Sequence, residues 1–394
     1  MAGLSGLLTS RLRTESHNRP WRVLHACELA SDAAALAESQ SLIGMAPQLL
    51  SREFWPSRTP RELSLLTVWH DVRDWRHELN DAEAASDIQL VHAHSFPSAM
   101  AGIRGTLPLV YEFTSTIDQV AATQAVSGPW LVRSLRVAEQ FVLSRAGAVV
   151  TRSSSMHKTA MERGTLPENL FTIPEPVPAE DPLVNSTNWA LQHHIHQPNG
   201  PLFIGLPDGV TGAEFILRAF AAMLPEVQHA ILLLESNQPE EARRLLRDLN
   251  LSEAVRVFSP SERTSALSCA DVVIAHGSSD ASGCNRSLLR ALAYGRPVIA
   301  TDLPENRECA PEGQGCIWYA SGDAGDLVRR ARFIAGDKDF CRSLGESGRE
   351  FIRTHRSATA IARRYDAVYR HAIARRSERL PRIPMPKLYA LGEA

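Results

Sequence analysis

The chain has 394 residues, of which 44% are apolar and 22% are charged, and its formal net charge is -2 at pH 7. This composition is typical of a globular protein and argues against extended disorder. The nearly balanced charge gives no support to nucleic-acid binding. The length exceeds one ordinary hydrophobic core and predicts two domains. No apolar run reaches the roughly 18 residues that a membrane span needs.

The cysteines and the N-terminal residues bear on the cellular compartment. Six cysteines are scattered along the chain without C-x-x-C pairs or histidines at metal-ligand spacing. This usage predicts a reduced, cytoplasmic protein without structural zinc. Residues 1–20 begin with a short apolar run and contain several arginines, but they lack the order of charge, apolar core and cleavage site of a secretory signal. We interpret them as a flexible lead-in.

The first half of the chain alternates apolar runs with segments of helical spacing. We expect strands at 23–26, 63–69, 88–93, 107–113 and 147–151, and helices at 32–45 and 130–145. Alternating strands and helices predict a mostly parallel sheet that is covered by helices on both faces. Residues 21–180 therefore form the first predicted domain.

A break follows in the proline-rich segment 172–182 and the polar segment 185–200. Prolines hold a chain extended and cannot continue a helix, so we place a linker at 181–200. His193, His194 and His196 in this segment allow two interpretations, a metal site or a solvated linker. The absence of a carboxylate or cysteine at ligand spacing favours the linker.

The second half repeats the alternation and forms the second predicted domain, 201–355. Strands are expected at 230–234, 255–258, 271–275, 297–300 and 316–319 after a first run at 201–205, and helices at 213–223, 240–249, 263–268, 285–294, 323–335 and 340–354. A C-terminal helix at 356–375 is expected to pack back on the first domain. Residues 376–394 have no clear period and are interpreted as a tail.

Residues 279–308 combine a polar loop, a helix, a turn, a strand and a second loop. The helix start near Asn285 offers backbone N–H groups and the positive end of a helix dipole, which suit a phosphate. The loop 301–308 lies beyond the carboxyl end of a strand, where open α/β sheets bind ligands. We therefore expect a ligand site here, facing a cleft between the two domains.

Several separated motifs carry a family resemblance. In the first half these are VHAH (91–94), the segment 138–164 with AGAVVTRSSS, and FTIPEPVP (171–178). In the second half they are LRALAYGRPVIATDLPENRE (289–308) and YASGDAGDLVRRARFI (319–334). In order and spacing the chain resembles a family 4 glycosyltransferase of the GT-B fold. The resemblance covers most of the chain from His92 onward.

The resemblance implies an α/β fold of two Rossmann-like domains facing a cleft. It implies a hexosyltransferase-like enzyme of carbohydrate biosynthesis that moves a sugar from a nucleotide-diphosphate donor to a carbohydrate or lipid-linked acceptor. Such transfer usually proceeds with retention and without a metal or other cofactor. The donor would bind the C-terminal domain. Peripheral membrane contact and a partner glycosyltransferase are compatible with the resemblance.

The chain departs from the family pattern at the donor site. The two glutamates of the family's E-x7-E motif are replaced by Ser282 and Arg290. The family's phosphate-neutralising Arg and Lys align with GLPDGVTG (205–212), which contains neither, and the glycine-rich acceptor loop is missing near the first strand. An arginine or lysine contact to a diphosphate contributes roughly 1.5–3 kcal/mol. Activity would require a different phosphate grip.

Six residues are the candidates for that grip. Arg286 and Arg290 are one turn apart on one helix face, where they could hold a phosphate. Their alternative is to pair with neighbouring acids such as Asp302, Glu305 or Glu308. The remaining donor-binding candidates precede the helix or begin it: Ser282, Gly283, Cys284 and Asn285.

Four strand-end or loop residues are candidates for chemistry. His94 could act as a base or orient an acceptor hydroxyl, and Glu308 could orient the donor. The alternatives are a strand-end histidine that is merely hydrogen-bonded and an acidic helix cap. Glu112 and His276 also lie at strand ends. Two functions stay open: an active glycosyltransferase, and a catalytically degenerate relative that serves as a binding or scaffold protein.

Overall fold

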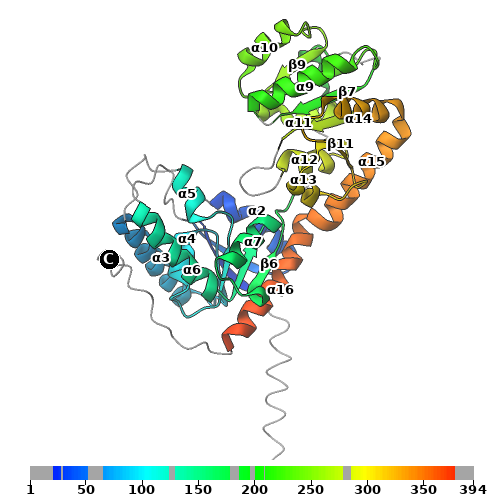
Figure 1. The fold of residues 1–394 in the computed structure, drawn as a ribbon. Coiled ribbons are helices and arrows are strands. Elements are labelled where there is room, and N and C mark those ends of the chain that lie inside the picture. Colours follow the sequence, from blue (N-terminus) through cyan, green and yellow to red (C-terminus); the bar gives the residue numbers. More distant parts are fainter. Residues whose placement is uncertain are drawn as a thin grey trace, which may run out of the picture. The chain divides into compact units, whose positions relative to one another are not determined.

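The fold consists of two compact α/β units. The structure is a computed structural model and describes residues 21–27, 30–51, 65–123, 129–177, 186–195, 200–207, 209–277 and 285–377. The first unit comprises Met1–Pro174 with Ile361–Ala394, and the second comprises Glu175–Ala360 (Figure 1). Each unit contains one parallel six-stranded sheet with helices on both faces. The predicted α/β class is confirmed.

The first sheet has the strand order β2-β1-β3-β4-β5-β6, and all its pairs are parallel. The order reverses between β1 and β3, which is where ligands bind in open α/β sheets, beyond the carboxyl ends of the strands. The strands are β1 (Arg22–Cys27), β2 (Ala46–Ser51), β3 (Leu90–Ala93), β4 (Leu109–Glu112), β5 (Ala148–Thr151) and β6 (Leu170–Thr172).

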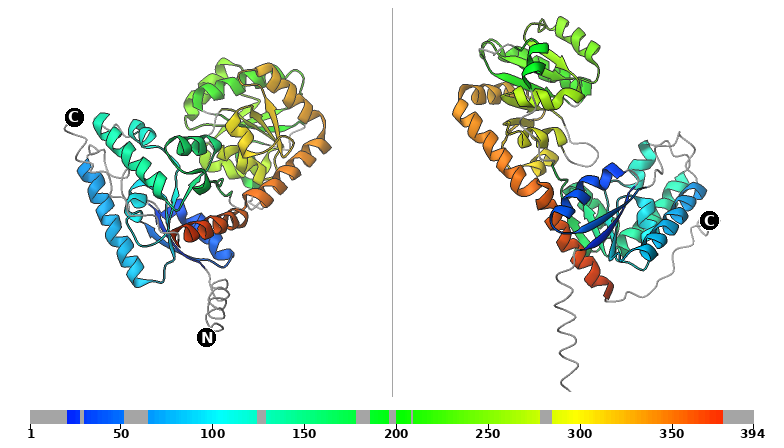
Figure 2. Two further views of the ribbon diagram at one scale, coloured as in Figure 1. Left: turned by 60° about the horizontal axis from the view of Figure 1, so that its bottom comes forward. Right: turned by 180° about the vertical axis from the view of Figure 1, so that it is seen from behind.

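Alternate residues of these strands enter two different cores. Leu24, Val91 and Leu109 pack against α3 (Leu65–Ala85), α4 (Phe96–Gly102) and α6 (Pro129–Arg145). Val23, Leu90 and Val110 pack on the opposite face with α2 (Ala30–Leu42) and α16 (Ala358–Ser377). Figure 2 shows α16, in red, running along this sheet. The remaining helices of the unit are α5 (Ile117–Thr123), α7 (Ser154–Glu162) and the single turn η1 (Pro167–Asn169).

The second sheet has the order β12-β11-β10-β7-β8-β9 and is also parallel throughout. Its strand order reverses between β7 and β10. The strands are β7 (Leu202–Leu206), β8 (Ile231–Glu235), β9 (Val255–Phe258), β10 (Val272–Ala275), β11 (Val298–Thr301) and β12 (Cys316–Tyr319).

Helices cover both faces of the second sheet. One face packs with α9 (Gly209–Met223), α10 (Pro239–Asp248), α14 (Ala324–Gly336) and α15 (Lys338–Phe351). The other packs with α8 (Ser186–Gln192), α11 (Arg263–Cys269), α12 (Arg286–Ala293) and α13 (Pro304–Cys309). The short turn η2 (Pro260–Glu262) precedes α11, and a π-helical turn, η3 (Ile352–Arg356), joins α15 to α16.

The region predicted as a linker contains packed structure. Trp189 of α8 and Ile195 are buried in the core beside α11. His193 Nε2 lies 3.0 Å from Glu262 Oε1, and the centroids of the His193 and Trp189 rings are 4.2 Å apart. His196 lies outside the described residues. One buried tryptophan anchors this otherwise polar segment. Polar composition alone therefore does not distinguish a surface helix from a linker.

The strand predicted at 63–69 is wrong. Residues from Leu65 onward form the start of α3. A short, mostly apolar segment fits a buried strand and a helix equally well, and the spacing of Val68, Val72, Trp75 and Leu79 decides for the helix. The edge strand β2 was not predicted, because its half-buried residues and Pro47 mask the strand signal. Among the described residues, no helix is long and apolar enough to cross a membrane.

Candidate functional site

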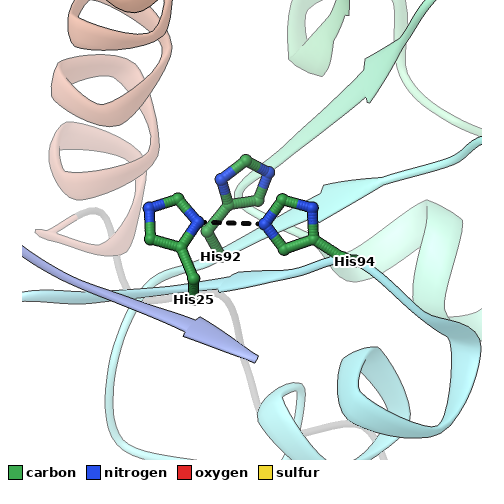
Figure 3. Close-up of side chains that lie close together, drawn as sticks. All are labelled: His25, His92 and His94. Carbon is green, nitrogen blue, oxygen red and sulfur yellow. Dashed lines mark hydrogen bonds between the residues drawn. The ribbon is translucent and has the colours of Figure 1, made fainter. Parts of the chain in front are cut away.

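Three histidines gather at the carboxyl edge of the first sheet, where its strand order reverses (Figure 3). His25 belongs to β1 and His92 to β3, and their Cα atoms are partners in the parallel pair. His94 follows β3 by one residue. Because side chains alternate along a strand, His92 and His94 lie on one face of the sheet, the face that α16 covers.

The three rings contact one another. His25 Nδ1 lies 2.9 Å from His94 Nε2. The rings of His92 and His94 are 4.2 Å apart between centroids, and those of His25 and His92 are 5.0 Å apart. One nitrogen from each ring lies within 4.8 Å of the other two. The group is the one set of three or more potential metal-ligating side chains at this spacing among the residues that the structure describes.

Each histidine also has an outer polar partner. His25 Nε2 lies 2.9 Å from Gln40 Oε1 of α2, and His92 Nδ1 lies 2.9 Å from the Tyr369 hydroxyl of α16. Gln40 Nε2 in turn donates to that hydroxyl at 2.7 Å. The third partner is Glu112, at the end of β4, whose Oε2 lies 2.7 Å from His94 Nδ1.

Burial controls the charges of this cluster. Removal from water disfavours the charged imidazolium, so burial lowers the pKa of His25 to about 3 and that of His92 well below its usual value. Burial alone would raise the pKa of Glu112, but the Arg152 guanidinium and His94 hold it well below the usual range. Arg152 Nε donates to Glu112 Oε1 at 2.8 Å. The cluster therefore combines the neutral imidazoles of His25 and His92 with one carboxylate–guanidinium pair, Glu112 and Arg152.

The structure brings together two predicted candidates, His94 and Glu112, but it does not present the His94 ring to solvent. The His94 side chain is 3% exposed, and its two nitrogens face His25 and Glu112. This geometry favours the alternative of a hydrogen-bonded strand-end histidine. His25, Gln40, Arg152 and Tyr369 were not predicted as members of the cluster. Of these four residues, only His25 carries a sequence signal for the cluster, because it lies in the first predicted strand.

In the second unit, Asn285 caps α12 and joins two loops. Its Oδ1 accepts from the backbone N–H of Leu288 at 3.0 Å, and its Nδ2 donates to Asn306 Oδ1 at 3.0 Å. Asn306 Nδ2 donates to the carbonyl of Thr301 at 2.8 Å and to that of Gly277 at 3.2 Å. These buried amides hold the loop after β10 and the loop after β11 together. The predicted donor-binding residues Ser282, Gly283 and Cys284 lie outside the described residues.

The two predicted arginines lie on the exposed side of α12. Arg286 Nε donates to Glu175 Oε2 at 3.0 Å, so this arginine pairs with an acid, as the alternative interpretation expects. Asp302 pairs with Arg307. The Glu308 side chain is exposed, while its backbone carbonyl accepts from Arg356 Nη2 at 2.7 Å. Asn285 and Arg290 thus belong to the cap and the exposed face of α12, and Glu308 lies on the neighbouring helix α13.

His276 lies where the strand order of the second sheet reverses. Its ring stacks on Phe215 of α9 with 4.4 Å between centroids, and its Nδ1 lies 2.5 Å from the Tyr319 hydroxyl. That hydroxyl also lies 2.8 Å from Thr301 Oγ1, and burial raises the pKa of Tyr319 to about 12. The contacts make His276 part of a partly buried polar network at the edge of the sheet, next to the loops that Asn306 joins.

Family models match both halves of the chain. A glycosyl transferase 4-like domain matches residues 10–176, and a domain described as glycosyl transferases group 1 matches residues 200–337. The chain belongs to the family 4-like glycosyltransferases of the GT-B fold.

Solved structures of such glycosyltransferases have the same fold. A glycosyltransferase from Rickettsia africae is similar with a TM-score of 0.69 and 13% identity, over 90% of this chain and 99% of that one. Anabaena HepE in complex with UDP is similar with a TM-score of 0.62 and 13% identity, over 88% of this chain and 98% of that one. The predicted GT-B fold is confirmed.

Curated relatives match over shorter stretches. N-acetyl-alpha-D-glucosaminyl L-malate synthase of Bacillus anthracis is 25% identical over 41% of this chain and 42% of its own length. An exopolysaccharide phosphotransferase of Streptomyces coelicolor is 26% identical over 42% of this chain and 18% of its own length. The chain thus spans less than half the length of each of these relatives.

Proposed function

We propose that this glycosyltransferase moves a hexosyl group from a nucleotide-diphosphate donor to a carbohydrate or lipid-linked acceptor, with retention at the anomeric carbon. The observation that carries the proposal is the arrangement at the carboxyl edge of the second sheet. There, Asn285 and Asn306 fix a helix start and two loops at the reversal of strand order, the usual ligand position of such sheets. Anabaena HepE, a member of this fold, is described in complex with UDP-glucose, which supports a nucleotide-sugar donor.

The donor grip in this proposal is built on α12. Backbone N–H groups at its start and the side chains of Arg286 and Arg290 supply positive charge toward the diphosphate. Arg286 would exchange Glu175 for a phosphate oxygen, whereas Arg290 lies one turn further along the same face. Glu308, exposed on α13, would orient the sugar. These groups would replace the two family carboxylates and two family cations that the sequence lacks.

In the first unit, we assign His94 a positioning role. Its buried ring contacts His25 and Glu112 and lies just inside the strand end, so it holds the edge of the sheet on which an acceptor would lie. A direct base would need a ring nitrogen exposed to the acceptor hydroxyl.

A second candidate function is a binding or scaffold protein that has lost transfer activity, including one that assists a partner glycosyltransferase. The specific observation in its favour is the Arg286–Glu175 ion pair. The donor grip requires the Arg286 guanidinium to contact a phosphate, but here it contacts a carboxylate. Ser282 and Arg290 in place of the family glutamates point the same way.

Calorimetric titration with UDP-, GDP- and ADP-sugars and the free nucleotides tests the proposal. We expect saturable binding of one donor, and a loss of affinity of about 10-fold or more in Arg290→Ala, because one charge-assisted contact contributes roughly 1.5–3 kcal/mol. Arg330→Ala, which removes an exposed arginine of α14, is the matched control and should bind normally. Failure of every donor at millimolar concentration would overturn the donor site. Binding without transfer to any acceptor of a glycan panel would favour the scaffold function.

A further inference from the structure

We propose that His25, His92 and His94 form a structural binding site for a divalent transition-metal ion, with Zn²⁺ as the first expectation. Three imidazoles are a common Zn²⁺ ligand set, and imidazole also suits Cu²⁺ and Ni²⁺. One nitrogen of each ring lies within 4.8 Å of the other two. In a tetrahedral site with Zn–N bonds of about 2.0–2.1 Å, ligand nitrogens are roughly 3.3 Å apart. Small side-chain movements would therefore bring the three nitrogens to the spacing that a bound ion requires.

The outer partners of the histidines support a metal site. Metal-bound histidines usually direct their second ring nitrogen to a carboxylate, an amide oxygen or another fixed polar group, which orients the ring. Here His25 Nε2 contacts Gln40, His92 Nδ1 contacts Tyr369, and His94 Nδ1 contacts Glu112. The remaining nitrogen of each ring, namely His25 Nδ1, His92 Nε2 and His94 Nε2, is the one that would bind the metal ion.

The hydrogen-bond pattern also leaves a gap that a cation would fill. Gln40 Nε2 donates to Tyr369, so Gln40 Oε1 is the acceptor that faces His25 Nε2. A proton on His25 Nε2 leaves a lone pair on Nδ1, and a proton on His94 Nδ1, which lies 2.7 Å from Glu112 Oε2, leaves a lone pair on His94 Nε2. These two lone-pair nitrogens are 2.9 Å apart. A metal ion or an additional proton between the two nitrogens is needed to make that contact favourable. The third ring also offers a nitrogen, because His92 Nε2 is buried without a hydrogen-bond partner.

The position of the site suggests its role. His25 and His92 come from neighbouring strands, and Tyr369 and Gln40 connect them to α16 and α2. The buried Glu112 carboxylate supplies negative charge beside the histidines. A bound ion would thus hold β1 and β3 together at the point where the strand order reverses, and would stabilise their contact with α16 through Tyr369. This role is independent of the proposed donor chemistry in the second unit.

Metal titration of the full chain, purified without a polyhistidine tag and stripped with EDTA, tests the site. We expect ZnCl₂ in competition with a chromophoric chelator to show one tight equivalent per chain with a Kd below about 1 μM, well within the range of protein zinc sites. Co²⁺ in place of Zn²⁺ should give the visible absorption of four-coordinate cobalt, and Zn²⁺ should raise the Tm. No tight equivalent in the folded protein would overturn the proposal and leave a proton shared between His25 and His94.

Variants locate the bound ion. His92→Gln and His94→Gln should each lower the affinity at least 100-fold, whereas His157→Gln, which alters a half-buried histidine of α7 outside the cluster, should not change it. Tyr369→Phe removes only the hydroxyl that orients His92, and should weaken binding about 10- to 100-fold even where a histidine variant fails to fold. Unchanged Zn²⁺ affinity in folded His92→Gln, His94→Gln or Tyr369→Phe would overturn the assignment.

Discussion

The buried Glu112 carboxylate is the residue on which the polar cluster of the first unit depends. It is 3% exposed and contacts both His94 and Arg152. Glu112→Gln should destabilise the first unit by about 3–5 kcal/mol, because the Arg152 guanidinium would lose its buried counter-charge. The measurement is the urea midpoint followed by circular dichroism. Glu162→Gln, which breaks an exposed pair with Lys158, is the control and should leave the midpoint nearly unchanged. Equal midpoints for the two variants would contradict this assignment.

Glu262 makes a contribution to stability that depends on pH. Burial would raise its pKa, but the backbone N–H of Ser259, the Trp189 indole, the Ser259 hydroxyl and His193 lower it to about 2. Since the folded-state pKa lies below the unfolded value of roughly 4.3, this stabilisation is present above about pH 4.3 and disappears as pH falls toward 2. The Tm advantage of the wild type over Glu262→Gln should therefore be full at pH 7 and shrink between pH 4.3 and 2. An advantage that stays constant over this range would contradict the linkage.

At the residue scale, sequence reasoning identified only part of the polar cluster. His94 and Glu112 stand out because they lie where strands end. Tyr369 contacts His92 across 277 positions of sequence. No local spacing predicts such a contact, because it depends on the path by which the last helix returns to the first sheet. Arg286 illustrates the same limit, since its partner Glu175 lies 111 positions away.

Among the elements, α12 depends on Asn285 for more than an ordinary cap. Asn285→Ala removes the acceptor for Leu288 N–H and leaves the buried Oδ1 of Asn306 without its donor. The expected loss is about 2–3 kcal/mol, the sum of a cap and an unpaired buried group. Asp323→Ala removes a cap and one exposed ion pair with Arg329 at the start of α14, but no buried partner, and should cost about 1 kcal/mol. Differential scanning calorimetry should show the larger Tm decrease for Asn285→Ala, and equal decreases would contradict the bridging role.

Sequence patterns predict the elements of the second unit well. The strands expected at 255–258 and 316–319 coincide with β9 and β12, because each is rich in β-branched or aromatic residues and lies between turn residues or polar residues. The first unit is harder to predict. The beginning of α3 has an apolar run that fits either period, and β2 lies at a half-buried sheet edge. Burial on one face sets the pattern of a strand, so an edge strand with little burial leaves a weak signal.

At the scale of the whole molecule, the chain leaves its first unit at Pro174 and returns to it at Ile361. The returning segment of α16 supplies Ile361, Tyr365, Val368 and Tyr369 to the core on one face of the first sheet. All four side chains are at most 3% exposed. The first sheet is therefore completed by residues that follow the entire second unit in the sequence, and its polar cluster is completed by the same helix through Tyr369.

Truncation should consequently unfold one unit and spare the other. Each large apolar side chain of α16 contributes roughly 1.5–3 kcal/mol by burial, so four of them rival the roughly 5–15 kcal/mol net stability of a domain. In a chain that ends at Ala360, hydrogen exchange should show loss of protection in β1 and β3, while β7 and β10 stay protected. A chain that ends at Ser377 keeps all of α16 and should match the full-length protein. Protected β1 and β3 amides in the shorter chain would show that the first sheet is stable without its C-terminal helix.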